Sequence, residues 1–216
     1  MYEDAYLVVE GHGEVQAASN LVSRLWADLG LPPVVWMNPP IRGLNLARRE
    51  GVTRACRLVR RKPKPGVLVI LRDEDDLCPR ETAPQAARWI AEEQLPFAAG
   101  VVLLHREFES LFLPCVRLMA GKPLVDERGV SRPGLVEGTS FSGDPESVRG
   151  AKEWLGRHFG SGRRYKPTLD QLPLTRMLDF AVLRSSGLPA FGTLERTLRF
   201  LSDHRSTRAV YPPPAA

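Results

Sequence analysis

Short, almost continuously apolar runs alternate along this chain with longer stretches in which an apolar residue recurs every three or four positions. Four runs predict strands, at residues 5–9, 33–37, 67–71 and 100–105. Four stretches predict helices, at residues 14–29, 43–61, 80–94 and 106–121, with Pro114 as a break in the last. Strands that are apolar on both sides and alternate with helices indicate an α/β fold with a mainly parallel sheet covered on both faces.

The regularity ends near residue 121. Residues 122–145 are rich in Gly, Pro, Ser and charge and predict a loop or excursion. Shorter helical patches follow, at 145–158, 168–184 and 193–203, before a tail that reads YPPPAA and predicts a frayed end. We therefore expect an α/β core over 1–121, an excursion over 122–145 and a basic, mainly helical C-terminal region over 146–216.

Composition changes this picture little, but the placement of charge adds to it. The 216 residues suffice for one sizeable core, and 43% hydrophobic with 25% charged residues is ordinary for a globular protein. The net charge is +5, and residues 151–216 hold 11 Lys and Arg against 5 Asp and Glu, so the whole excess lies there. A surface for a polyanion and an ordinary solvated face both remain open.

Several protein classes are disfavoured. No apolar run approaches the roughly 18 residues that a membrane span needs. The first residues, MYED, lack the basic and apolar regions of a secretory signal, so we expect a cytoplasmic protein. Cys56, Cys78 and Cys115 are far apart and without His at ligand spacing, which indicates reduced thiols and no structural zinc.

Acidic residues follow three of the predicted strands. Glu10 follows the first, the run RDEDD with Asp73 and Asp75 follows the third, and Glu107 and Glu109 follow the fourth. The carboxyl ends of parallel strands share one edge of the sheet, where α/β proteins bind ligands. Carboxylates brought together repel one another unless a cation joins them, and oxygen ligands suit Mg²⁺ or Mn²⁺. A solvated acidic turn is the alternative for RDEDD.

The turn GHGE at 11–14 has two other interpretations. A dinucleotide-binding loop would need Gly or Ala at Gln16 and an acid at the end of the second strand, and neither is present. A phosphate loop of the Walker type is excluded because no Gly-Lys-Ser/Thr occurs. We expect instead that the glycines let the backbone turn tightly near a ligand, while Glu10 and Glu14 hold metal.

The order of these motifs resembles the Toprim domain of topoisomerases, bacterial-type primases and the OLD (overcoming lysogenization defect) nucleases. VVEGHGE after the first strand, VLVILRDEDD after the third and HREFESLFL after the fourth carry the resemblance over residues 4–118. The last motif is similar to small stand-alone Toprim proteins encoded beside ATPases in bacterial defence-type gene sets. Leu111-Phe112 stands where an aromatic residue and then Leu would be expected. The fold that the resemblance implies is a Rossmann-like Toprim core.

The resemblance also implies roles for individual residues. Glu10 matches a metal ligand or general base, and Asp73 and Asp75 match the paired aspartates that bind the cation. Glu14 matches a second metal-binding glutamate, and Glu109 and Glu107 match the acids of the third motif. Nuclease members carry a downstream lysine, for which Lys166 in RRYKP is the candidate.

The expected activity is therefore Mg²⁺- or Mn²⁺-dependent hydrolysis of a nucleic-acid phosphodiester, with DNA favoured over RNA and an ATPase as the implied partner. One alternative is a non-catalytic regulatory or recognition subunit of an ATPase complex that keeps the metal site. Another is a phosphotransferase or phosphatase that acts on small molecules. Two basic loops are candidates to contact nucleic acid. Their residues are Arg60, Arg61, Lys62, Lys64, Arg163, Arg164 and Lys166.

Overall fold

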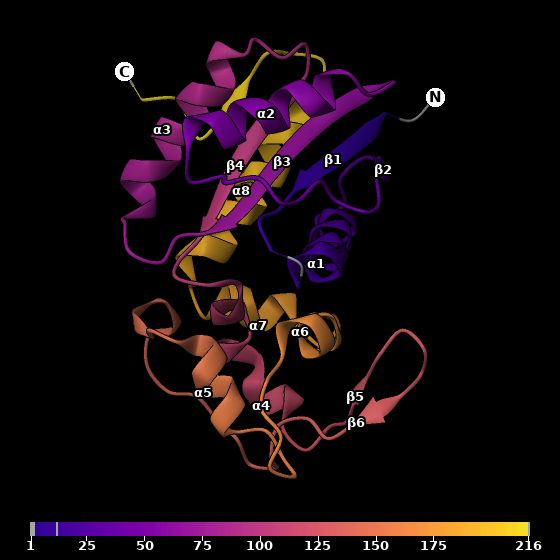
Figure 1. The fold of residues 1–216 in the computed structure, drawn as a ribbon, viewed down its shortest axis with the longest axis vertical. Coiled ribbons are helices and arrows are strands. Elements are labelled where there is room, and N and C mark those ends of the chain that lie inside the picture. The colour runs from indigo at the N-terminus through magenta and orange to yellow at the C-terminus, as the bar shows by residue number, and fades with distance from the viewer. Residues whose placement is uncertain (1–2, 12, 216) are drawn as a thin grey trace.

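A five-stranded parallel sheet forms the centre of the protein (Figure 1). The computed structural model describes residues 3–11 and 13–215. The strands lie in the order β2-β1-β3-β4-β7, and every pairing within this sheet is parallel. Their bounds are β1 Asp4–Val8, β2 Val35–Trp36, β3 Pro65–Asp73, β4 Ala98–Leu104 and β7 Val210–Tyr211. The predicted α/β class, with a mainly parallel sheet flanked by helices, is confirmed.

Two hydrophobic cores cover the two faces of the sheet. Val67, Val69 and Leu71 of β3 point into one core, and Leu68 and Ile70 point into the other. The first core is completed by α1 (Glu14–Asp28) and α8 (Pro189–Asp203), and the second by α2 (Arg49–Arg60) and α3 (Pro79–Glu92). Alternate residues of one strand are thus buried on opposite sides, which is why the strand is apolar without interruption.

A second group of short elements lies beyond the carboxyl ends of the strands (Figure 1). It contains the hairpin of β5 (Leu124–Val125) and β6 (Ser131–Arg132), and the helices α4 (Val116–Met119), α5 (Ala151–Arg157), α6 (Pro167–Arg176) and α7 (Phe180–Ser185). Helix α6 packs against α1, so this group is joined to the sheet on the side where the predicted acids lie.

Two predicted helices within residues 1–121 differ from the structure. The helix expected over 43–61 begins only at Arg49, because Leu44 and Leu46 are buried in the preceding loop. The helix expected over 106–121 is replaced by two 3₁₀ turns, Phe108–Leu111 and Leu113–Cys115, and the short α4, with Pro114 in the second turn.

The C-terminal end also differs from its prediction. Val210 and Tyr211 pair with Ala99 and Gly100 of β4, so the first residue of the expected frayed tail belongs to the edge strand β7. Helix α8 packs on β4 as well, and the C-terminal region therefore returns to the sheet after forming the outer helices.

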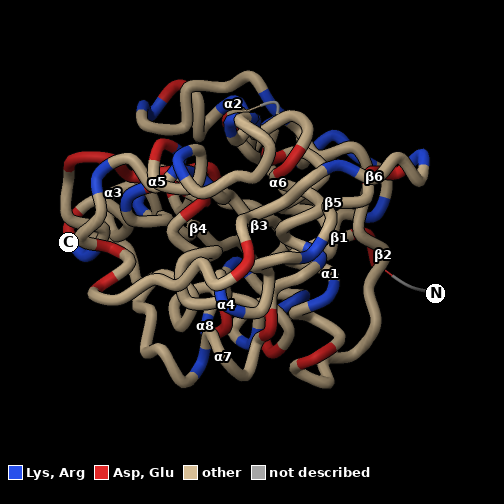
Figure 2. Tube along the Cα trace, turned by 90° about the horizontal axis from the view of Figure 1, so that it is seen from below, with Lys and Arg blue, Asp and Glu red and all other residues tan. Residues whose placement is uncertain are grey.

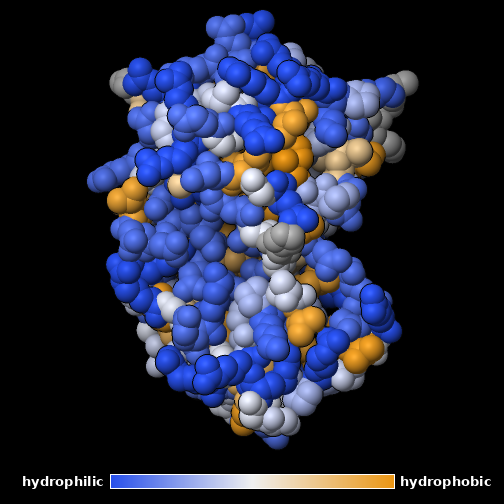
Figure 3. Space-filling view, viewed as in Figure 1, coloured by the Kyte–Doolittle hydropathy of each residue, from blue (hydrophilic) through white to orange (hydrophobic). Residues whose placement is uncertain are grey.

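The surface is mostly hydrophilic on the face drawn in Figure 3, with separate hydrophobic patches. Figure 2 shows that Lys and Arg are spread around the chain and interspersed with acids, instead of forming one continuous stripe. Within the described ranges, none of the helices has the length and apolarity required to span a bilayer.

Candidate functional site

Asp73 ends the apolar strand β3 at the carboxyl edge of the sheet, and the segment after β4 holds its side chain in place. Asp73 Oδ1 accepts a hydrogen bond of 2.8 Å from the backbone N–H of Phe108. Burial raises the pKa of Asp73 well above its ordinary value, and the nearby carboxylates of Glu14 and Glu109 raise it further. Burial and the neighbouring acids therefore both disfavour the charged form of Asp73.

The two glutamates after β4 have different partners. Glu107 Oε1 accepts a hydrogen bond of 3.0 Å from the backbone N–H of Ala151, the first residue of α5. Glu109 is fully buried. Its Oε1 atom accepts a hydrogen bond of 2.7 Å from the Tyr165 hydroxyl and one of 3.3 Å from the Gln171 amide. Burial raises the pKa of Glu109 to about 6. Glu107 thus fixes the start of α5, and Glu109 ties the cluster to the segment around α6.

Lys152 of α5 lies among these acids. Its Nζ atom is 3.7 Å from Asp73 Oδ2, 3.5 Å from Glu107 Oε2 and 3.6 Å from Glu109 Oε2. Burial by itself would lower the pKa of Lys152, but the three carboxylates raise it above its ordinary value. The carboxylates thus keep the ammonium charged, and the side chain as a whole remains 40% exposed.

Glu10 and Glu14 flank the turn between β1 and α1 on the other side of Asp73. Glu10 Oε1 accepts a hydrogen bond of 2.8 Å from the backbone N–H of Leu46, and Glu14 Oε2 accepts one of 3.3 Å from the backbone N–H of Gly11. Burial raises the pKa of each glutamate, and the charge of Glu10 raises that of Glu14 further. The charge of Glu14 also raises the pKa of Asp73, so Glu14 is near both Glu10, which follows β1, and Asp73, at the end of β3.

The glycines of the turn make room for neighbouring side chains. A Cβ atom at Gly13 would fall 2.7 Å from Gln171 Oε1 and 2.8 Å from Pro167 Cβ, at the start of α6. A Cβ at Gly11 would fall 3.1 Å from Glu14 Oε1. Gly13 has an ordinary helical φ of −65°, so it is required for space and not for an unusual backbone conformation.

The acidic run after β3 does not act as one unit. Glu74 is buried and pairs with Arg72 at 2.6 Å, whereas Asp76 is 71% exposed. Asp75 is exposed, but its charge raises the pKa of Glu10, so it lies at the outer edge of the cluster. The sequence predicted Asp73 and Asp75 as a pair, and the structure places Asp73 inside the cluster and Asp75 at its rim.

The donor atoms of the cluster suit a hard divalent cation. They are carboxylate oxygens, and two of them, Glu107 Oε2 and Glu109 Oε2, are buried without a hydrogen-bond donor. Among residues 3–11 and 13–215, however, no three His, Cys, Asp or Glu side chains are already arranged to hold a metal ion. The residues fit Mg²⁺ or Mn²⁺ in chemistry, and side-chain movement would be needed to close a coordination sphere.

Lys152, and not the predicted Lys166, is the lysine of the cluster. Lys166 is exposed at the start of α6, where its backbone N–H donates a hydrogen bond of 2.8 Å to the carboxylate of Asp170. In the described part of the chain its ammonium makes no ion pair with the acids. Tyr165 and Gln171, which bind Glu109, were also not predicted. Their contacts join distant segments, and no local motif marks them.

A groove of about 640 Å³ adjoins the cluster and shares Lys152 and Tyr165 with it. Its other charged lining residues are Glu153, Arg157, Arg163 and Arg164. Arg163 is engaged, since it pairs with Asp170 and its guanidinium lies 4.8 Å from the centre of the Phe159 ring. Arg157 and Arg164 are exposed, so the groove presents positive charge next to the acids.

The other predicted basic loop lies elsewhere. Residues 60–64 connect α2 to the first residue of β3, and the backbone carbonyl of Lys64 accepts from the N–H of Asp4 at the start of β1. The loop is therefore at the amino edge of the sheet, and Asp73 is at the opposite end of the nine-residue strand β3. Arg60, Arg61 and Lys62 cannot contact the phosphate that the acids would bind.

The comparisons with known proteins identify one family. A model described as a domain of unknown function (DUF4276) matches residues 9–199. This range includes the carboxylate cluster, which consists of Glu10, Glu14, Asp73, Glu107 and Glu109. No curated protein and no solved structure matches the chain.

Proposed function

The chain belongs to the family described as a domain of unknown function (DUF4276), and we propose that it is a divalent-metal-dependent nuclease of the Toprim type. One observation carries the proposal: acids from three separate segments meet at the carboxyl edge of a parallel sheet. Glu10 follows β1, Asp73 ends β3 and Glu109 follows β4. Perturbed pKa values cluster at functional sites, and the raised pKa values of Glu10, Asp73 and Glu109 support the proposal.

The candidate metal ligands are the carboxylates that follow β1, begin α1 and end β3. They are Glu10, Glu14 and Asp73, with Asp75 at the rim and Glu109 behind. A bound Mg²⁺ or Mn²⁺ ion would supply Lewis-acid polarisation of a phosphoryl group and neutralise its charge. The raised pKa of Asp73 supports this role, because an added cation would stabilise its charged form against burial and against the repulsion from Glu14 and Glu109.

The remaining roles fall to groups of the chain itself. Lys152 presents a charged, partly exposed ammonium beside the acids, where it would offset the charge that develops on a phosphate during cleavage. Glu10, half-buried with a raised pKa, is placed to accept a proton from an attacking water. Both roles require that a phosphate enters between the turn at 11–14 and α5.

A polymer is the proposed substrate because the groove beside the cluster is basic. Arg157 and Arg164 would contact backbone phosphates on either side of the one that is cleaved, which gives affinity independent of sequence. DNA is favoured over RNA, and an ATPase partner in a bacterial defence-type system is proposed from the Toprim resemblance.

A second function is favoured by one observation. Lys152 already lies among three carboxylates, and no metal-binding group is preformed among the described residues. A cluster neutralised in this way also fits a non-catalytic recognition subunit that keeps the fold of the metal site. The two functions differ in whether a divalent ion and a cut substrate are ever found.

The test is a cleavage assay with the purified chain. Plasmid and labelled single-stranded DNA are incubated with Mn²⁺ or Mg²⁺, with and without EDTA. We expect cleavage that EDTA abolishes and that falls roughly a hundredfold or more in Asp73→Asn. Asp76→Asn is the matched control from the same acidic run, and it should cleave normally because Asp76 pairs only with the exposed Arg149. Absence of metal-dependent cleavage would favour the recognition subunit.

A further inference from the structure

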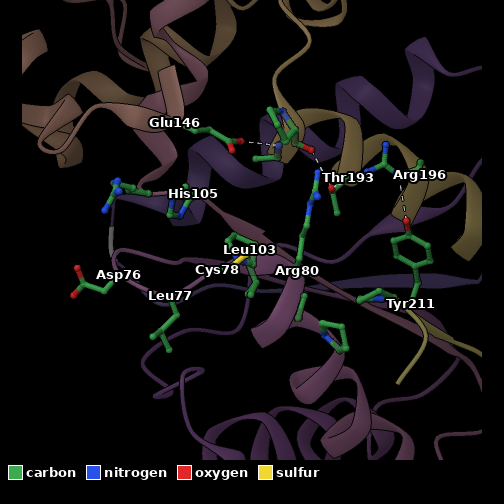
Figure 4. Close-up of a pocket in the computed structure, with 17 residues that line it drawn as sticks. Asp76, Leu77, Cys78, Arg80, Leu103, His105, Glu146, Thr193, Arg196 and Tyr211 are labelled. Carbon is green, nitrogen blue, oxygen red and sulfur yellow. Dashed lines mark hydrogen bonds between the residues drawn. The ribbon is translucent and has the colours of Figure 1, made fainter. Parts of the chain in front are cut away.

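A second cavity, separate from the carboxylate cluster, opens beside the carboxyl end of β4. It has a volume of about 590 Å³ and lies between the first turns of α3 and α8, with Leu103 and His105 at its base (Figure 4). No residue of the cluster lines it. The size is that of a cavity for a small organic ligand.

Three arginines line this cavity without a carboxylate partner in the described part of the chain. Arg80 makes no hydrogen bond or ion pair there, and Figure 4 shows it extending from α3 toward the α8 side of the cavity. Arg196 donates to the Thr193 hydroxyl at 2.9 Å and the Tyr211 hydroxyl at 3.2 Å. Arg106 donates a hydrogen bond of 2.9 Å to the backbone carbonyl of Asp75, and its buried Nε has no hydrogen-bond partner among the described residues.

The acids that line the cavity are already engaged. Asp76 pairs with Arg149 at 2.9 Å, and Glu146 accepts 2.8 Å from the backbone N–H of Ala190 in the first turn of α8. Among the described residues, neither acid forms an ion pair with any of the three arginines. At the start of α3, Cys78 provides no side-chain cap, which leaves further partial positive charge facing the same space.

Apolar groups lie next to these arginines. Leu77, Leu103, Tyr211 and Pro212 form the apolar part of the lining, and Leu77 is 59% exposed. A ligand that satisfies both parts has a phosphate or similar dianion at one end and an apolar or aromatic body at the other. A simple ion would leave the apolar wall exposed.

We propose that this cavity binds a nucleotide-sized organic phosphate, with Arg80 and Arg196 contacting its phosphate group. Guanidinium groups match phosphate oxygens in geometry and charge. Leu103 and Tyr211, which line the same cavity, would pack against the base of the nucleotide. This binding does not depend on the proposed nuclease activity, because the cavity and the carboxylate cluster share no residue.

The test is isothermal titration calorimetry in EDTA, so that divalent ions do not contribute. Adenosine monophosphate should bind, whereas adenosine and inorganic phosphate should each bind more weakly by roughly tenfold or more. Arg80→Gln should weaken binding of the monophosphate by roughly tenfold or more, and Arg80→Gln combined with Arg196→Gln should abolish it. Arg199→Gln, an exposed arginine on the same α8 that does not line the cavity, should bind as the wild type does.

The proposal would be overturned if the monophosphate did not bind at millimolar concentration or if adenosine bound as tightly as the monophosphate. Unchanged binding of the monophosphate by Arg80→Gln would overturn it too. Binding of a short single-stranded oligonucleotide without binding of the mononucleotide would also overturn it, since the cavity would then serve a polymer. Arg80 contacts no other described side chain by a hydrogen bond, so Arg80→Gln should fold normally, and circular dichroism checks this.

Discussion

The ammonium of Lys152 lies 3.7 Å from Asp73 Oδ2, which joins the short helix α5 to the end of the central strand β3. The same ammonium is 3.6 Å from Glu109 Oε2, so one cation of the chain serves carboxylates from two strand ends. A divalent ion at this edge would have to share oxygens with Lys152. The lysine therefore sets how tightly such an ion binds.

Replacement of Lys152 by methionine should tighten Mn²⁺ binding by about tenfold, because a positive charge next to the ion's ligands is removed. Lys152→Arg keeps the charge and should bind Mn²⁺ about as the wild type does. Isothermal titration calorimetry measures both. Cleavage by Lys152→Met should fall even though its metal affinity rises. Unchanged or weaker Mn²⁺ binding by Lys152→Met would show that the ion and the lysine do not share ligands.

Stability should fall as the pH rises from about 4.5 through about 6, in part because of Glu109. Burial raises the pKa of Glu109 from 4.5 to about 6, so its stabilising contribution is complete below the lower value and is lost above the higher one. This contribution corresponds to about 2 kcal/mol. Lys152, whose pKa is raised above 10.5, adds no pH dependence in this range.

Urea denaturation in EDTA at several pH values measures this effect. Glu109→Gln has no charge to titrate and should show a decrease in the free energy of unfolding that is smaller by about 2 kcal/mol. Part of the decrease should remain, because the pKa values of Glu10, Glu14 and Asp73 are raised too. Identical pH profiles for the two proteins would contradict the raised pKa of Glu109.

Gly13→Ala should destabilise the protein by about 1–3 kcal/mol, because the added methyl group must displace the start of α6. Its Cβ would lie 2.7 Å from Gln171 and 2.8 Å from Pro167. Gly156→Ala in α5 is the matched control, since the nearest atom to its Cβ would be 3.6 Å away. Thermal unfolding should show a loss for Gly13→Ala and no loss for Gly156→Ala. Equal stabilities would refute the close packing of the turn on α6.

Arg157→Gln and Arg164→Gln should each lower the slope of log K against log salt for DNA binding by about one. Arg61→Gln and Lys62→Gln, which lie at the amino edge of the sheet, serve as controls and should leave the slope unchanged. Fluorescence anisotropy at several salt concentrations measures the slopes. A larger effect of the control substitutions would place the DNA at the amino edge.

Much of the fold is readable from the sequence because the central strands are buried on both faces. Val67 to Leu71 is continuously apolar for this reason, and its end at Asp73 marks the edge of the sheet. The two-residue strand β7 has no such signal. It is recognisable only through its pairing with β4, and the prolines after Tyr211 favour an irregular tail.

Some residues of the candidate site can likewise be predicted from the sequence, and others cannot. Glu10, Asp73 and Glu109 can be predicted because each follows a strand, and strand ends in a parallel sheet converge. Lys152 cannot, because its place depends on the hydrogen bond from Ala151 to Glu107, which joins α5 to the segment after β4. The assignment to Lys166 followed a basic motif, and one position away Tyr165 makes the contact with Glu109.

The most direct measurement is a titration of the purified chain with Mn²⁺, followed by the electron paramagnetic resonance signal of the free ion. If the carboxylates from β1, α1 and β3 bind a divalent ion, the chain should remove at least one Mn²⁺ from solution. Asp73→Asn, which can still accept the hydrogen bond from Phe108, should remove none at that site, whereas Asp76→Asn should bind as the wild type does. Identical titrations for wild type and Asp73→Asn would contradict a metal site at this edge of the sheet.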